Sequence, residues 1–212
     1  MPDYREMLKQ THLFPPQEGV QPPGVTPNDV IDLVSQIPQV SPKGELEWIV
    51  KDGLAVEMYR QHYGVRRSPR LHADLDIWVF RNYGIYRALG NQEVTRKRLD
   101  VQSPLVSRYF IQFPEALILD TVREIPITSQ TSIHVFCIHP ALIALHKITD
   151  PRSLRDQDRC DLDVLSDLRQ SSLVNMQVWD RIIYRAIRCL DSSLQNRATE
   201  RWQIFKGNPD NL

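Results

Sequence analysis

The sequence predicts a mixed α/β protein, in which a small mixed sheet is flanked by helices and followed by a C-terminal helical bundle. Three observations predict this fold class. Apolar residues lead into Gly53 and then recur at helical spacing as far as Tyr59, which is typical of a strand, a turn and a helix. A second apolar strand is expected at 74–80. From residue 139 onward, apolar residues recur three and four positions apart, which indicates packed helices.

The chain divides into three predicted regions. Residues 1–25 contain five prolines and predict an extended or irregular segment. Residues 26–138 form the α/β core, which opens with a helix capped by Thr26 with Pro27 at its first position. Residues 139–212 form the helical region. The expected strands lie near 46–51, 74–80, 107–112, 116–121 and 132–138, and the expected helices near 26–37, 53–62, 139–148, 157–169, 173–192 and 194–205.

Composition limits the class of protein. A chain of 212 residues is long enough to bury a core in one or two domains. The formal net charge is zero, so no overall field draws the protein to nucleic acid. The three cysteines are odd in number and lack metal-binding spacing, which favours a reduced, cytoplasmic compartment. No apolar stretch approaches the ~20 residues of a membrane span, and the N-terminus lacks a signal-peptide core.

A pair of carboxylates stands at the start of the strand expected at 74–80. Side chains alternate along a strand, so Asp74 and Asp76 point to one face while Leu75 and Ile77 point to the other. Two like charges this close repel each other unless a cation lies between them. Mg²⁺ binds carboxylate oxygens and keeps positions open for substrate phosphates. Taken alone, however, the pair is also compatible with an edge strand that has a solvated polar face.

Two further segments carry residues suited to phosphate chemistry. Glycine at position 53 lets the backbone approach a phosphate at the start of a helix, although it also serves any tight turn. Lys147 stands near the end of the helix expected at 139–148, where the helix dipole alone favours a cation. Asp158 and Asp161 lie three positions apart on one face of the next helix.

In combination, these segments resemble nucleotidyltransferase-fold proteins of the AbiEii toxin group and their minimal relatives. That family has a strand with Gly-Gly or Gly-Ser, a helix, and then Arg-x-(Thr or His)-x-Asp-x-Asp. A helix with a lysine and an Arg-x-x-Asp-x-x-Asp-Leu helix follow. Here Asp52 precedes Gly53 in place of the family's first glycine, which puts an acid beside the expected triphosphate site. The matching residues, between about 45 and 170, are Gly53, Arg70, His72, Asp74, Asp76, Lys147, Arg155, Asp158 and Asp161.

The resemblance implies a polymerase-β-like fold and a metal-dependent transfer of a nucleoside monophosphate from an NTP to a hydroxyl, often a tRNA 3′ end in AbiEii-like toxins. Asp74 and Asp76 would bind Mg²⁺ or Mn²⁺, and Lys147 and Asp158 would complete the catalytic set, with Asp158 orienting Lys147 or the acceptor. A toxin would also have an antitoxin or other protein partner. Nucleotide binding would fall to Gly53, Arg70, Lys147 and Arg155.

A third metal-binding carboxylate of the wider superfamily is not obvious. Asp120, at the end of the strand expected at 116–121, is the best positional candidate. An acid at that place is equally compatible with the opening of a turn. His72 is interpreted as positioning the loop before the Asp pair, and His134 and His139 as ordinary polar residues.

Basic clusters bear on the acceptor. Arg66 and Arg67 precede the Asp pair by only a few positions and are the acceptor-binding candidates. A second set recurs at helical spacing, and we interpret it as a solvated face paired with local acids such as Asp180 and Asp191. That set is Arg181, Arg185 and Arg188.

Two other functions remain open from the sequence. Asp52 and the lack of a clear third acid suggest a module that keeps the fold but binds a protein partner without catalysis. The Arg-x-His-x-Asp-x-Asp pattern is also shared with nucleotidyltransferases that modify small-molecule antibiotics. A cationic drug would require an acidic acceptor pocket, whereas tRNA would require a basic surface.

Overall fold

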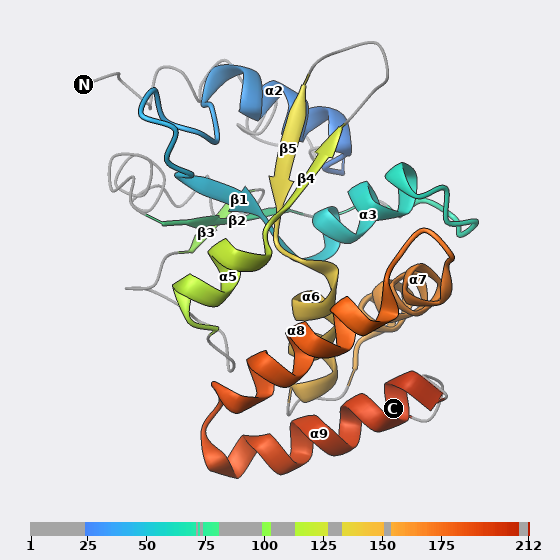
Figure 1. The fold of residues 1–212 in the computed structure, drawn as a ribbon. Helices are drawn as coiled ribbons and strands as arrows, with labels where there is room; N and C mark the ends of the chain where they lie inside the picture. The colour runs from blue at the N-terminus through green and yellow to red at the C-terminus, as the bar shows by residue number, and fades with distance from the viewer. Residues whose placement is uncertain are drawn as a thin grey trace. The chain divides into compact units, whose positions relative to one another are not determined.

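In a computed structural model of the protein, the described residues are 24–70, 72, 74–80, 99–102, 113–126, 133–150, 154–207 and 212. They form seven helices and five strands, arranged in two compact units (Figure 1). The first unit consists of Met1–Met58, Pro69–Arg108 and Glu124–Cys137. The second consists of Tyr59–Ser68, Tyr109–Arg123 and Ile138–Leu212, so the chain changes unit several times, the last time at 137/138, one residue before the expected boundary.

The first unit contains a mixed five-stranded sheet with the order β3-β2-β1-β5-β4. The central strand β1 (Trp48–Val50) is antiparallel to β2 (Leu75–Val79) and parallel to β5 (His134–Cys137). Strand β2 is parallel to β3 (Leu99–Gln102), and β4 (Arg123–Pro126) forms the other edge. The sheet confirms the predicted mixed α/β class and the strands expected near 74–80 and 132–138.

Helix α2 (Pro27–Gln36) begins where the sequence predicts. The Asp29 carboxylate accepts hydrogen bonds from the backbone N and the hydroxyl of Thr26, both at 2.8 Å, which fixes the first turn. After the helix, the buried side chain of Gln39 connects the central strand β1 with its neighbour β5. Its Nε2 donates to the carbonyls of Trp48 (3.3 Å) and Phe136 (2.9 Å), and its Oε1 accepts from the Phe136 amide (2.7 Å).

The second unit is helical. Helix α6 (Pro140–Thr149) is buried on almost every side because it packs against α7 (Asp156–Gln170), α8 (Met176–Arg188) and α9 (Ser192–Gly207). The apolar stripe expected on α7 is confirmed, since Leu162, Leu165 and Leu168 are buried. Helix α8 is shorter than the predicted 173–192. The Asn175 side chain caps its first turn, accepting from the amides of Gln177 and Val178.

One predicted strand is wrong. Residues near 116–121 form helix α5 (Glu115–Thr121), with Pro114 at its N-cap. A short apolar run such as Ala-Leu-Ile-Leu does not distinguish a strand from a buried helical turn. The strands β3 and β4 were not predicted, and the predicted strand near 107–112 and nearly all of the N-terminal segment lie outside the described residues.

Candidate functional site

The Asp pair of the first unit lies beside the start of helix α3 (Asp52–His62). Strands β1 and β2 pair with Val50 opposite Ile77, and the Lys51 amide then donates to the Asp76 carbonyl at 3.0 Å. Leu75 and Ile77 are buried while Asp74 and Asp76 are partly exposed, so the predicted alternation is confirmed. The end of β1, the first turn of α3 and the start of β2 therefore meet at one edge of the sheet, the edge formed by strand ends and not by an outer strand.

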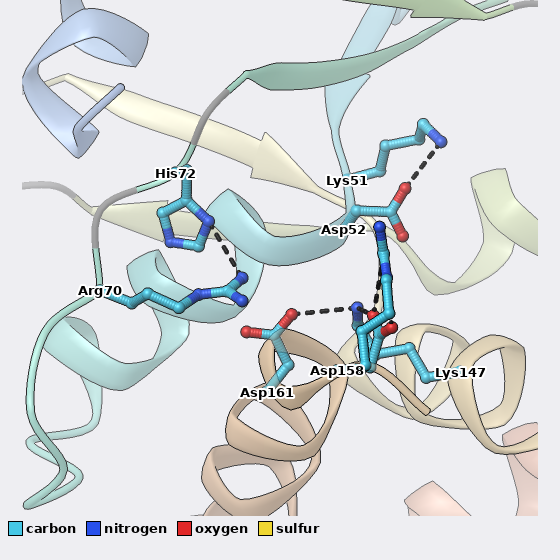
Figure 2. Close-up of polar contacts among 8 residues, drawn as sticks. Lys51, Asp52, Arg70, His72, Lys147, Asp158 and Asp161 are labelled. Carbon is cyan, nitrogen blue, oxygen red and sulfur yellow. Dashed lines mark hydrogen bonds and ion pairs between the residues drawn. The ribbon is translucent and has the colours of Figure 1, made fainter. Parts of the chain in front are cut away.

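Gly53 is in the first turn of α3, where the backbone is approached closely by two side chains. A Cβ atom at this position would lie 2.6 Å from Arg70 Nη2 and 2.8 Å from His72 Nδ1. The same two atoms are 3.2 Å apart, so the guanidinium and the imidazole are in contact above the turn (Figure 2). Glycine is therefore required here for space. His72 is buried and is held by backbone pairing with Val25, which agrees with a positioning role.

Asp52, directly before Gly53, has a φ of 53°. This is the left-handed region, which costs a residue with a Cβ roughly 1–2 kcal/mol, although aspartate tolerates it better than most. Its Oδ2 is 2.9 Å from Nζ of the buried Lys51 (Figure 2). The backbone at Asp52 thus adopts a conformation that glycine favours, while the side chain supplies a carboxylate paired with a lysine.

Lys51 is a charged residue of this edge that the sequence reasoning did not single out. Its position in the sequence, at the end of an apolar strand and directly before an Asp-Gly turn, is the pattern that could have identified it.

The second unit contains a separate charged cluster, formed by the end of α6 and the first turns of α7. Lys147 Nζ is 2.8 Å from Asp158 Oδ1 and 3.0 Å from Asp161 Oδ2, and only 8% of the Lys147 side chain is exposed (Figure 2). Arg155 donates to both oxygens of Asp158, from Nε at 2.8 Å and from Nη2 at 3.2 Å. The expected contacts of Asp158 with Lys147 and Arg155 are therefore present.

The charges of this cluster compensate one another. Burial alone would raise the pKa of Asp158, but the hydrogen bond from Arg155 and the charge of Lys147 outweigh it and hold that pKa well below its usual range. Asp158 consequently remains a carboxylate at neutral pH, and the lysine ammonium is held by two acids on one face of α7.

The remaining candidates occupy other places. Arg67 Nε donates to Asp167 Oδ2 at 2.6 Å, and its guanidinium reaches Asp163 at 3.4 Å, so this acceptor-binding candidate is paired with α7. Arg66 is exposed. Asp120 lies on α5, half-exposed, 2.9 Å from Arg185 Nη2, and nothing in this placement supports a metal-binding role.

Comparisons with known proteins give no family. No protein-family model matches the chain, and no curated protein matches it significantly.

Among the residues described, no three or more histidine, cysteine, aspartate or glutamate side chains are grouped in a way that could hold a metal ion. None of the described helices combines the length and apolar character needed to cross a membrane.

Proposed function

We propose that the protein is a metal-dependent nucleotidyltransferase, which moves a nucleoside monophosphate from an NTP to an acceptor hydroxyl. One observation carries the proposal. The register of β1 and β2 sets Asp76 opposite Lys51, and so brings the Asp74 and Asp76 pair next to the tight glycine turn that opens α3. A carboxylate pair beside a helix start combines a cation site with amides suited to an anion.

The donor set fits a magnesium ion that is shared with the substrate. Asp74 and Asp76 supply two carboxylates, and Mg²⁺ in nucleotide sites is held by one or two carboxylates together with substrate phosphates and water. When bound, the ion neutralises charge on the phosphates as pyrophosphate leaves. The set does not suit a cage of protein ligands alone, because among the described residues no third ligand is grouped with the pair.

The protein side chains have distinct roles in this reaction. The acceptor oxygen forms a bond to the α-phosphorus, the bond from that phosphorus to the bridging oxygen of the β-phosphate breaks, and the hydroxyl proton is released to solvent. Arg70, held by its contact with His72, and the backbone at Gly53 would bind the phosphates. The ammonium of Lys147, to which the resemblance assigns a point charge for the triphosphate, is held in place within the second unit by Asp158 and Asp161.

The test is transfer of label from each α-³²P-labelled NTP, in Mg²⁺, to total tRNA and to small-molecule acceptors. Asp74→Asn and Asp76→Asn are expected to lower the rate by about a hundredfold, which corresponds to ~3 kcal/mol of transition-state stabilisation. Asp191→Asn, at an exposed position after α8, is the matched control and should retain full activity. Full activity in both Asp-pair variants would refute the proposal.

A second function is favoured by one observation at the same edge. The carboxylate of Asp52 stands at the first turn of α3, where it would repel a triphosphate. Absence of both NTP binding by calorimetry and label transfer would favour this second function, a module that binds a protein partner without catalysis. If Asp52→Gly then gains NTP binding, the loss of chemistry is explained by this one residue.

A further inference from the structure

Helix α8 has one buried and one exposed face. Trp179, Ile182, Ile183, Ala186 and Ile187 are buried against the other helices of the second unit. The opposite face exposes Arg181, Tyr184, Arg185 and Arg188, which we call the α8 strip. At 1.5 Å per residue the three arginines extend over about 10 Å along the helix axis.

One of the two acids expected to neutralise the α8 strip, Asp180, is engaged elsewhere. Asp180 Oδ1 accepts from Arg169 Nη2 at 3.1 Å. Of the three arginines, Arg185 is paired with a carboxylate, that of Asp120. Arg188 Nε donates to the Tyr184 carbonyl at 3.2 Å. Within the described part of the chain, no carboxylate lies at ion-pair distance from Arg181 or Arg188. The face is solvated, as predicted from sequence, but these two arginines lack the predicted acidic partners.

Tyr184 is fixed in this strip by helix α9. Its hydroxyl lies 3.1 Å from Gln203 Nε2 and 3.5 Å from Lys206 Nζ, and the ammonium is 5.8 Å from the ring centroid. The side chain nevertheless remains 37% exposed. An aromatic ring is thus held among cations without being buried.

We propose that the α8 strip binds single-stranded RNA, with the arginines on the phosphate backbone and Tyr184 against an unpaired base. Arginine forks bind phosphate oxygens in pairs, and an aromatic ring among cations is the usual platform for an unpaired base. A membrane surface is disfavoured, because a helix that lies on a membrane needs an exposed apolar face and the apolar face of α8 is buried. The inference goes beyond the proposed function and is tested independently of it.

The experiment measures binding separately from chemistry. Fluorescein-labelled unstructured RNA of about 20 nucleotides, longer than one typical single-strand site, is titrated with the full-length protein by anisotropy at several salt concentrations. In the double variant Arg181→Gln/Arg188→Gln, the slope of log K against log salt should fall by about 1.4, because each contact to single-stranded phosphate contributes about 0.7. Tyr184→Leu should weaken binding about tenfold. Arg159→Gln, which removes an exposed arginine of α7, is the control.

The outcomes separate this inference from the proposed function. An unchanged slope and affinity in the double variant would overturn it, even if transfer activity is found. Equal affinity for a polyglutamate of similar charge would also overturn it and would assign the strip to an acidic protein. RNA binding that depends on the strip and persists in Asp74→Asn supports it, whether or not any nucleotide is transferred.

Discussion

His139 makes the stability of the second unit depend on pH. Its side chain is 2% exposed, accepts a hydrogen bond from the Ala141 amide at Nδ1 (3.1 Å) and thereby caps helix α6. Its ring also packs edge-on against Trp179, with centroids 5.8 Å apart. Burial, followed by the positive charge of Arg123, lowers the pKa of His139 to about 3.

The sign and size of the effect follow from this pKa. The unfolded chain binds the proton near the ordinary histidine pKa of about 6.5, whereas the folded protein resists it. The stabilising contribution is therefore complete above that value and is lost as the pH falls toward 3. Each pH unit in this range costs about 1.4 kcal/mol, so roughly 2 kcal/mol of the free energy of unfolding is lost between pH 7 and pH 5.

Urea unfolding at these two pH values, on the wild type and on His139→Asn, isolates the effect. Asparagine is a good N-cap and does not titrate, so the variant keeps a cap acceptor without the proton. All other histidines are common to both proteins, and their contributions cancel. The wild type should lose about 2 kcal/mol more than the variant, while His62→Asn, at an exposed position, should behave as the wild type. Equal losses in wild type and His139→Asn would show that His139 is protonated in the folded protein.

Three further substitutions test the packing. Gln39→Ala removes three hydrogen bonds at the sheet centre and should lower the free energy of unfolding by about 3 kcal/mol, measured in urea against Gln36→Ala, which should change little. Asp180→Ala leaves the nearly buried Arg169 without its carboxylate, so thermal unfolding should show a loss of about 1–3 kcal/mol; an unchanged melting temperature would contradict it. Gly53→Ala forces a Cβ into occupied space and should cost about 1–3 kcal/mol, and a neutral result would mean that the side chains above the turn move aside.

The elements that the sequence predicts correctly are those whose capping residues and burial pattern agree with the packing around them. Thr26 and Pro27 mark the start of α2, and the alternation around Asp76 marks β2, because capping and burial there depend on a few neighbouring residues. The segment containing Asp120 was misassigned because its apolar run fits either structure. Pro114 before the run and Glu115 in its first turn are the features that favour the helix.

The candidate site shows the same limit. The contact of Lys147 with Asp158 was expected because they belong to one motif, and it is present. The pairing of Arg67 with Asp167, a hundred positions later, and the diversion of Asp180 from Arg181 to Arg169 could not be predicted. Such pairs depend on how helices far apart in sequence pack, which residue spacing alone does not encode.

The central position of β1 constrains the order in which the protein can assemble during synthesis. One neighbour, β2, follows soon after it in the chain, but the other neighbour is β5, which ends at Cys137. Until that residue has left the ribosome, one edge of the central strand lacks its native partner. The side-chain amide of Gln39, which bonds to Phe136 in the folded protein, lacks its partner as well. An uncovered apolar strand of this kind attracts other chains. A nascent chain of fewer than 137 residues is therefore expected to depend on chaperones, and a chain truncated before β5 is expected to aggregate.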